Sequence, residues 1–143
     1  MLFLLSTKHR EGELQEAKHV GISKDGRLYP HDHYDKARSF YEGKLGFEFV
    51  SLDKFALVMS VGGHMIRITK IPNFAPLQGT ILGWQVEDIQ SAATWLKNRG
   101  VPPEKYPFAQ DQTLGIWTTP DGSKVAWFKD PDGNILSVSQ HVS

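Results

Sequence analysis

Three histidines near the start of the chain have the residue type and spacing to take part in metal chemistry. His31 and His33 flank Asp32 in a short polar stretch after Pro30. In an extended segment, side chains two residues apart point to the same side, a spacing found in metal sites. A solvated polar loop is the competing interpretation of this stretch, and it is the one that we favour.

His19 lies in residues 17–23, where apolar and polar side chains alternate before a Lys-Asp-Gly turn signal. This alternation predicts a strand, although residues 11–20 are also compatible with a helix. We favour the strand because the internal repeat described below requires one at this place. His19 would then project from one face of a sheet, where a neutral imidazole could bind a metal or donate a hydrogen bond to a ligand.

The overall composition excludes several other kinds of chemistry. The 143 residues include 16 Lys plus Arg and 16 Asp plus Glu, for a formal net charge of zero, and there is no cysteine. A neutral chain without a basic block has no electrostatic surface for nucleic acid or for an anionic membrane. The lack of cysteine excludes disulfides, thiol catalysis and cysteine-bound zinc, and it is compatible with a cytoplasmic location. No Ser-His-Asp order or phosphate-binding loop indicates hydrolysis or phosphoryl transfer.

Glycine and proline divide the chain into a repeated order of elements. We expect an N-terminal extension over residues 1–16, whose apolar residues 1–5 form an extra strand or part of the core, and a single domain over 17–143. This domain comprises module one (17–70), a proline-containing linker (71–79) and module two (80–140). The expected elements after residue 23 are a helix over 35–45, strands over 47–51, 55–60, 64–70 and 80–86, a helix from the Asp88 cap to Gly100, and strands over 116–119, 124–129 and 134–140.

Three motifs occur in this order: KARSFY with LGF (36–41 and 45–47), WQVEDI (84–89) and WFKDPDGN (127–134). With the doubled strand-helix-three-strand module, they resemble the vicinal oxygen chelate superfamily, which includes glyoxalase I, bleomycin-resistance proteins and extradiol dioxygenases. The resemblance implies an α+β fold in which two βαβββ modules form a cup-shaped, partly open β-barrel with the helices outside, and a homodimer. Residues 24–34 and the first sixteen residues are additional to the family pattern.

Strand alternation sorts the side chains of the four strands that begin or end a module onto two faces. One face is entirely apolar and should lie beneath the helices. The other is mixed, small and polar, and should form the wall of a cup that is open to a ligand. Its members are His19, Gly21, Ser23, Met65, Arg67, Thr69, Ile81, Gly83, Gln85, Ile135, Ser137 and Ser139.

The resemblance implies a divalent metal held by one ligand from each of these four strands. The matching positions are His19, Arg67, Ile81 and Ser137. Arginine is a permanent cation, isoleucine has no donor atom and a neutral serine is a poor ligand, so His19 alone is suitable. We therefore expect no metal and no other cofactor.

The alternative is a displaced metal site built from His19, His31 and His33, with Asp32 beside them. Such a site would support a metal-dependent lyase, isomerase or dioxygenase of the same superfamily. Whether the protein is an enzyme is therefore left open by the sequence.

Without the metal, the predicted cup remains suited to a small organic ligand. Arg67 could bind a carboxylate or phosphate through its two-pronged guanidinium, and His19, Gln85, Ser137 and Ser139 could supply hydrogen bonds. Each of these residues also has an ordinary structural interpretation, as an ion-paired arginine or as half-exposed strand polarity. We expect a small-molecule-binding protein whose ligand is small, organic and possibly anionic.

Aromatic side chains are frequent in the second half of the chain. We expect Trp84 and Trp95 in the helix–sheet core, and Trp117 and Trp127 in the last sheet, where some rings could stack on a flat ligand. Residues 105–114, with two aromatic side chains, are interpreted as a well-packed connection or as a lid. If large aromatic side chains fill the cup, the domain would instead serve protein interaction.

Overall fold

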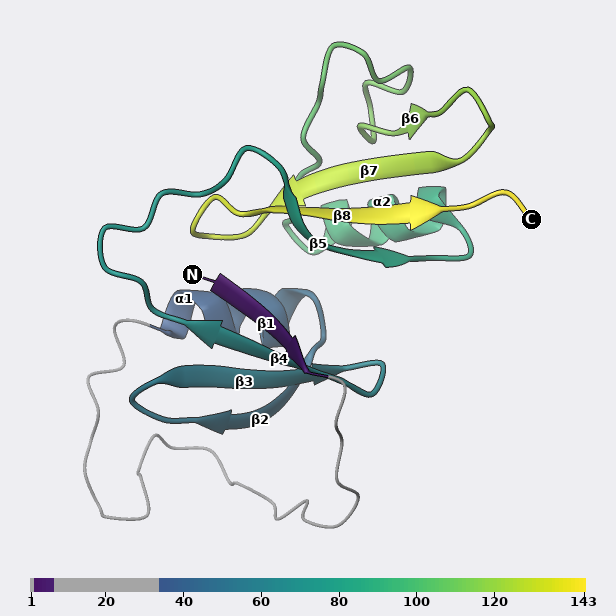
Figure 1. Cartoon of the computed structure of the whole chain (residues 1–143). Helices are drawn as coiled ribbons and strands as arrows, with labels where there is room; N and C mark the ends of the chain where they lie inside the picture. The colour runs from purple at the N-terminus through teal and green to yellow at the C-terminus, as the bar shows by residue number, and fades with distance from the viewer. Residues whose placement is uncertain (1, 7–33) are drawn as a thin grey trace. The chain divides into compact units, whose positions relative to one another are not determined.

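The computed structural model describes residues 2–6 and 34–143, and the chain divides into two compact units, Met1–Phe74 (unit 1) and Ala75–Ser143 (unit 2). The boundary falls inside the linker predicted over 71–79. Each unit contains a four-stranded sheet and a helical segment, as Figure 1 shows. The predicted α+β class is confirmed. The predicted cup depends on how the two sheets are placed relative to one another and stays a prediction.

Unit 1 contains a sheet with the strand order β1-β4-β3-β2. Its core combines apolar residues of the helical segment with those of β3 and β4, and the most deeply buried are Ala37, Tyr41, Ala56, Leu57, Met59, Ile66 and Ile68. Burial of such side chains contributes about 1.5–3 kcal/mol each, which holds the helix against the sheet. The strands are β1 (Leu2–Ser6), β2 (Glu48–Leu52), β3 (Ala56–Val61) and β4 (His64–Thr69).

The helix of unit 1 changes its hydrogen-bond pattern partway along. An α-helical turn, α1 (Asp35–Arg38), continues as the π-helical segment η2 (Ser39–Lys44), and the amide of Leu45 donates to the carbonyl of Phe40 at 2.9 Å. Gly46 follows with φ of 76°, a left-handed conformation that glycine adopts without strain. The predicted helix over 35–45 with its glycine C-cap is confirmed.

Strand β1 lies antiparallel to β4, with Leu2 opposite Thr69 and Ser6 opposite Met65. The N-terminal apolar run therefore forms an edge strand next to β4, as β5 does next to β8 in unit 2. That it is additional to the strand predicted over 17–23 stays a prediction. The strand predicted over 17–23, its helical alternative over 11–20, and His19, His31, Asp32 and His33 lie outside the described residues.

Unit 2 has the strand order β5-β8-β7-β6, in which β5 and β8 are parallel and the other pairs are antiparallel. Its elements are β5 (Thr80–Gln85), α2 (Ile89–Asn98), β6 (Trp117–Thr118), β7 (Lys124–Lys129) and β8 (Ile135–Gln140). All were predicted within two residues. Strand β6 is shorter than predicted because Ile116 bridges to Asp111 and Thr119 enters the turn before β7.

Helix α2 is fixed at both ends by local hydrogen bonds. Asp88 caps its first turn by accepting from the Ser91 amide at 3.1 Å, as predicted. At the other end, the helix closes through Arg99 and Gly100, whose amides donate to carbonyls of the last turn. None of the helices among the described residues is long and apolar enough to span a membrane.

The inner side of α2 packs on β7 and β8, and its buried residues are Ile89, Ala93 and Leu96. Trp95 points away from this stripe and is 44% exposed, with the Arg99 guanidinium 4.5 Å from its ring centroid. The expectation that Trp95 belongs to the helix–sheet core is therefore wrong, since its helical position places it on the opposite side of the apolar stripe.

The DPDGN motif forms the turn between β7 and β8. Buried Asp130 accepts from the amides of Asp132 and Asn134, both at 2.9 Å, and from the Asn134 side-chain amide at 2.8 Å. Gly133 has φ of 85°. These contacts give the motif a structural role: it sets the register in which β7 and β8 present their side chains.

Candidate functional site

The predicted residues Gln85, Ser137 and Ser139 lie on one face of the unit 2 sheet. Ser137 is opposite Gly83 on β5 and Trp127 on β7, and Ser139 is opposite Gln85 and Val125. The other face contains Leu136 and Val138, which are buried on the side of α2. We use the name open face for Gly83, Gln85, Val125, Trp127, Ser137 and Ser139. None of these six residues has a formally charged side chain.

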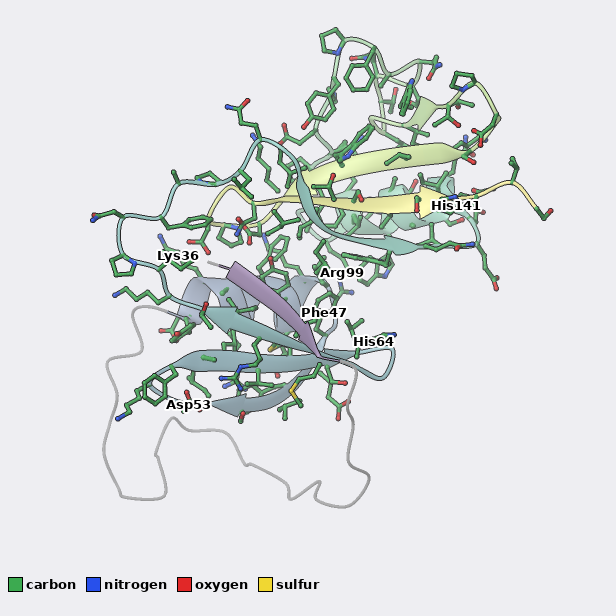
Figure 2. The ribbon with its side chains drawn as sticks, in the orientation of Figure 1. Lys36, Phe47, Asp53, His64, Arg99 and His141 are labelled. Atoms are coloured by element: carbon green, nitrogen blue, oxygen red, sulfur yellow. The ribbon has the colours of Figure 1, made fainter. Side chains whose placement is uncertain are left out.

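The polar groups of the open face differ in their hydrogen bonding. Ser139 Oγ lies 3.1 Å from His141 Nε2, just beyond the end of β8, where Figure 2 labels His141. Within residues 2–6 and 34–143, neither the carboxamide of Gln85 nor the hydroxyl of Ser137 has a hydrogen-bond partner. Gln85 is exposed and Ser137 is half-buried. Both groups are therefore available to a ligand or to water.

Gly83 leaves space beside it that the Ser137 hydroxyl occupies. A Cβ atom at this position would lie 2.5 Å from Ser137 Oγ, well inside van der Waals contact. Because the obstructing atom is a hydroxyl at the tip of a short side chain, a larger residue would turn this hydroxyl aside. Gly83 therefore determines where the Ser137 hydroxyl points.

A β-bulge changes which residue of β5 joins this face. Thr80 pairs with Ile135 and Leu82 with Leu136, so Ile81 is the extra residue between them. The hydroxyl of Thr80 instead accepts a hydrogen bond of 3.1 Å from Trp127 Nε1. Alternation along the sequence places Ile81 on the face with Gly83 and Gln85 and does not identify Thr80. No glycine in the sequence indicates the bulge.

Four aromatic rings gather beside the open face, and we call them the ring cluster: Tyr106, Phe108, Trp117 and Trp127. Tyr106 and Phe108 are stacked, with centroids 5.3 Å apart and planes 3° apart. Both meet Trp127 edge to face, at 5.4 and 5.9 Å, and Trp117 lies 6.1 Å from Trp127. Phe108 is 56% exposed, and the other three rings are half-buried.

Hydrogen bonds from side chains to the backbone hold the connection that bears Tyr106 and Phe108. Gln110 exchanges two bonds with the backbone of Thr118, at 2.8 and 3.1 Å, and Gln112 donates to the carbonyls of Tyr106 and Ala109. The amide of Glu104 donates to the carbonyl of Trp127 at 2.8 Å. The structure thus supports the interpretation of residues 105–114 as a well-packed connection.

Arg67 belongs to unit 1, on the face of β4 opposite the buried Ile66 and Ile68. It pairs with Val58 on β3 and Leu4 on β1, and it is half-buried. In the part of the chain that the structure describes, its guanidinium makes no ion pair or hydrogen bond. The predicted convergence of Arg67 with the residues of unit 2 stays a prediction.

The carboxyl groups with shifted pKa values lie in structural turns. Hydrogen bonds from the Ser91 backbone and side chain lower the pKa of Asp88, and hydrogen bonds from the Thr119 side chain and the Ser123 backbone lower that of Asp121. Both groups stabilise local structure through their charged form.

The helix α2 also borders an open depression of about 430 Å³, lined by Gln90, Ser91, Thr94, Trp95 and Asn98.

A group of three or more residues of the kinds that bind metal is not found among residues 2–6 and 34–143. Of the positions that resemblance assigns to metal ligands, Arg67, Ile81 and Ser137 lie on described strands. Their chemistry does not fit a divalent cation: a guanidinium repels it, an isoleucine has no donor, and a neutral hydroxyl binds it poorly. His19 lies outside the described residues.

Comparison with known proteins gives the family context of this arrangement. Structures with similar folds include a glyoxalase family protein of Bacillus anthracis (20% identity, 75% of this chain and 83% of that chain, TM-score 0.58). Lactoylglutathione lyase of Agrobacterium tumefaciens is also similar (22% identity, 76% of this chain and 86% of that chain, TM-score 0.54). A third similar structure is that of TnmS3, an antibiotic binding protein of Streptomyces sp. CB03234 (22% identity, 77% of this chain and 88% of that chain, TM-score 0.53).

These identities establish similarity of fold alone, and the search of curated proteins found no match. A family model does match the sequence over residues 18–138, which cover nearly all of both predicted modules and every residue of the open face except Ser139. The chain therefore belongs to the glyoxalase/bleomycin resistance protein/dioxygenase superfamily.

Proposed function

We propose that this protein binds a small organic molecule through the open face of unit 2 and does so without the superfamily's metal. The observation that supports this most directly is the pair of polar groups without partners, Gln85 and Ser137, beside a fixed cluster of aromatic rings. Concave ligand sites typically combine a few hydrogen-bonding groups with aromatic surface. The similar fold of an antibiotic binding protein is consistent with a binding role.

We propose binding without a metal because of the residue types at the positions expected to hold it. Arg67, Ile81 and Ser137 stand where relatives are expected to supply three of the four ligands. A metal site in a protein needs several matched donors, and one histidine cannot replace them. We therefore assign Arg67 a different role, as the group that binds an acidic part of the ligand, with His19 as a further hydrogen-bond donor.

A ligand screen tests the proposal. We expect compounds from a set of anionic and aromatic metabolites to raise the melting temperature, because a ligand that binds the folded state stabilises it by mass action. Ser137→Ala and Gln85→Ala should weaken the binding of the compounds found, each by about tenfold if one ligand hydrogen bond is lost. Thr94→Ala, on the exposed side of α2, is the matched control and should leave binding unchanged.

Arg67→Leu extends the test to unit 1. This substitution should weaken the binding of acidic compounds and leave the binding of uncharged compounds unchanged. If no compound binds, or if binding is equal in wild type and in all three site variants, the proposed function is wrong.

The competing function is a metal-dependent lyase, isomerase or dioxygenase that uses His19, His31 and His33. The spacing of the last two residues motivates it. Metal analysis of protein purified without a histidine tag decides between the two functions. A stoichiometric metal that is lost in the His31→Ala/His33→Ala double variant would establish this alternative and overturn the metal-free proposal.

We further propose a homodimer in the cytoplasm, with no nucleic-acid or membrane partner. The zero net charge and the lack of cysteine support the location and the choice of partners. Light scattering after size exclusion measures the oligomeric state, and a monomer mass at working concentration would contradict the dimer.

A further inference from the structure

We infer that the ring cluster of unit 2 is a stacking site for an uncharged, planar aromatic group of the ligand, with Phe108 as its exposed contact ring. This inference rests on the proposed function and narrows its ligand class. It follows from the exposure of the rings, the way in which they are fixed, and the chemistry of the surface beside them.

The first observation is an unusual concentration of accessible aromatic surface. Phe108 is 56% exposed although it is stacked on Tyr106 and meets both tryptophans of the ring cluster. An isolated exposed aromatic residue needs no explanation, but four rings in mutual contact form a continuous apolar patch. One face of Phe108 is used by Tyr106, so further stacking must use ring surface that faces away from the cluster.

The second observation is that the rings are positioned before any ligand arrives. Trp127 Nε1 donates a hydrogen bond to Thr80 Oγ1 at 3.1 Å, which fixes the direction of the indole. The side chains of Gln110 and Gln112 fix the backbone on both sides of the Tyr106–Phe108 pair. Fixed rings lose little conformational freedom on binding, so the energy of stacking is retained in the affinity.

The third observation concerns charge. The open face beside the rings has no formally charged side chain, and its hydrogen-bonding groups, Gln85, Ser137 and Ser139, are neutral. Lys129, two residues after Trp127 at the end of β7, forms an ion pair with Glu104 at 3.7 Å. An uncharged ring system with a hydroxyl or carbonyl at its edge matches both parts of this surface. The Ser137 hydroxyl lies over Gly83, where a Cβ atom would approach it to 2.5 Å, and is the hydrogen-bonding group that such an edge would meet.

Three small probes that share a two-ring skeleton test the inference. Naphthol is planar and uncharged, decalinol is its saturated and non-planar counterpart, and naphthoate is planar and anionic. Titrations of the isotope-labelled protein are followed by NMR through the four tryptophan indole N–H signals. We expect naphthol to shift the signals of Trp117 and Trp127 and to leave that of Trp95 unchanged. Decalinol should bind more weakly by about two- to tenfold, as expected for the loss of one aromatic contact. Naphthoate should also bind more weakly, because its carboxylate must be desolvated beside neutral groups.

Phe108→Leu removes the exposed ring and keeps an apolar side chain at the same position. Phe108→Leu should weaken the binding of naphthol by a similar factor and reduce the protein's preference for naphthol over decalinol. Trp95→Leu, at another exposed aromatic residue of unit 2, is the matched control and should change neither value. Thermal melts of both variants verify that the fold is intact, and Tyr106→Leu serves as a second test if Phe108→Leu unfolds.

Equal binding of naphthol and decalinol, or naphthol shifts confined to Trp95, would overturn the inference. Screened ligands that depend on Gln85 and Ser137 but not on Phe108 would overturn the stacking site alone and leave the proposed function intact. If neither the screened compounds nor naphthol bind, both fail together.

Discussion

In unit 2 the leading strand β5 runs parallel to β8, whereas in unit 1 the strand β1 runs antiparallel to β4. The difference follows from the connections. Residues 86–88 join β5 to α2, and this helix crosses over to β6, which runs in the same direction as β5. The antiparallel pairs β6–β7 and β7–β8 then leave β8 parallel to β5. Residues 7–34 separate β1 from α1, a connection long enough to allow either direction. The direction of an added edge strand is thus a consequence of its linkage rather than of its own sequence.

The two sheets also differ in the chemistry of their faces. Unit 1 presents the cation Arg67 on β4, while unit 2 presents neutral hydrogen-bonding groups beside the ring cluster. The repeated module therefore carries two chemically different faces on the same framework.

Gly115→Ala should be the most destabilising of the proposed changes. Gly115 has φ of 67°, and a Cβ atom would lie 2.5 Å from the backbone oxygen of Glu104, which cannot rotate away. We expect the free energy of unfolding to fall by about 2–5 kcal/mol, from left-handed strain plus overpacking. Gly63 in unit 1 has φ of 79° but open space around it. The substitution Gly63→Ala should therefore lower the free energy of unfolding by only about 1–2 kcal/mol. Chemical denaturation measures both, and equal losses would show that the close approach at Gly115 is unimportant.

Deletion of residues 2–6 should weaken unit 1 and leave unit 2 unchanged. The deletion removes the antiparallel ladder on β4, and each net backbone hydrogen bond contributes about 1 kcal/mol before the regained chain entropy is subtracted. We expect a loss of about 1–2 kcal/mol and faster amide hydrogen exchange in β4. Exchange in β8, the corresponding strand of unit 2, is the internal control. Unchanged exchange in β4 would contradict the pairing of β1 with it.

Thr80→Val removes the hydrogen-bond partner of Trp127 Nε1 and keeps the shape of the side chain. The bond lies near solvent, so water can replace it, and we expect a loss of only about 0.5–1 kcal/mol. The Trp127 indole N–H signal should move, and naphthol affinity should fall because the ring is less well fixed. Thr94→Val on the exposed side of α2 controls for the substitution itself. An unmoved Trp127 signal would argue against the bond across β8.

Asp88→Asn should have the smallest effect at neutral pH, since asparagine also caps helices well. The pKa of Asp88 lies below its usual 3.8 because Ser91 donates to the carboxylate. The contribution of the charge is therefore fully present above the usual value and is lost as the pH falls through the lowered pKa. Thermal melts from neutral to acidic pH should show a smaller acid-induced loss in Asp88→Asn than in wild type. Identical pH profiles would remove this carboxylate from the acid response of unit 2.

Sequence patterns predicted the elements of unit 2 well because each is bounded by a local signal. Asp88 caps α2, the DPDGN motif closes the β7–β8 turn, and alternation along β8 separates Ser137 and Ser139 from the buried Leu136 and Val138. Such signals depend on residues close in the chain, so they can be read without knowing the fold.

Other features had weaker signals or none. The spacing of Ser139 and His141 places both side chains on one side of an extended chain, so their contact could have been anticipated. The bulge at Ile81 has no signal in the sequence. Trp95 was misplaced because its aromatic character was given more weight than its position on the helix.

The superfamily, the α+β class, the turns and the uncharged composition of the open face followed from the sequence alone. These properties depend on residue type and on local spacing. The tertiary structure decided that β1 lies antiparallel to β4, that Thr80 orients Trp127, and that Tyr106 and Phe108 join two distant tryptophans in one cluster. These depend on contacts between residues far apart in the chain, where packing selects one among several arrangements that the local sequence allows equally well.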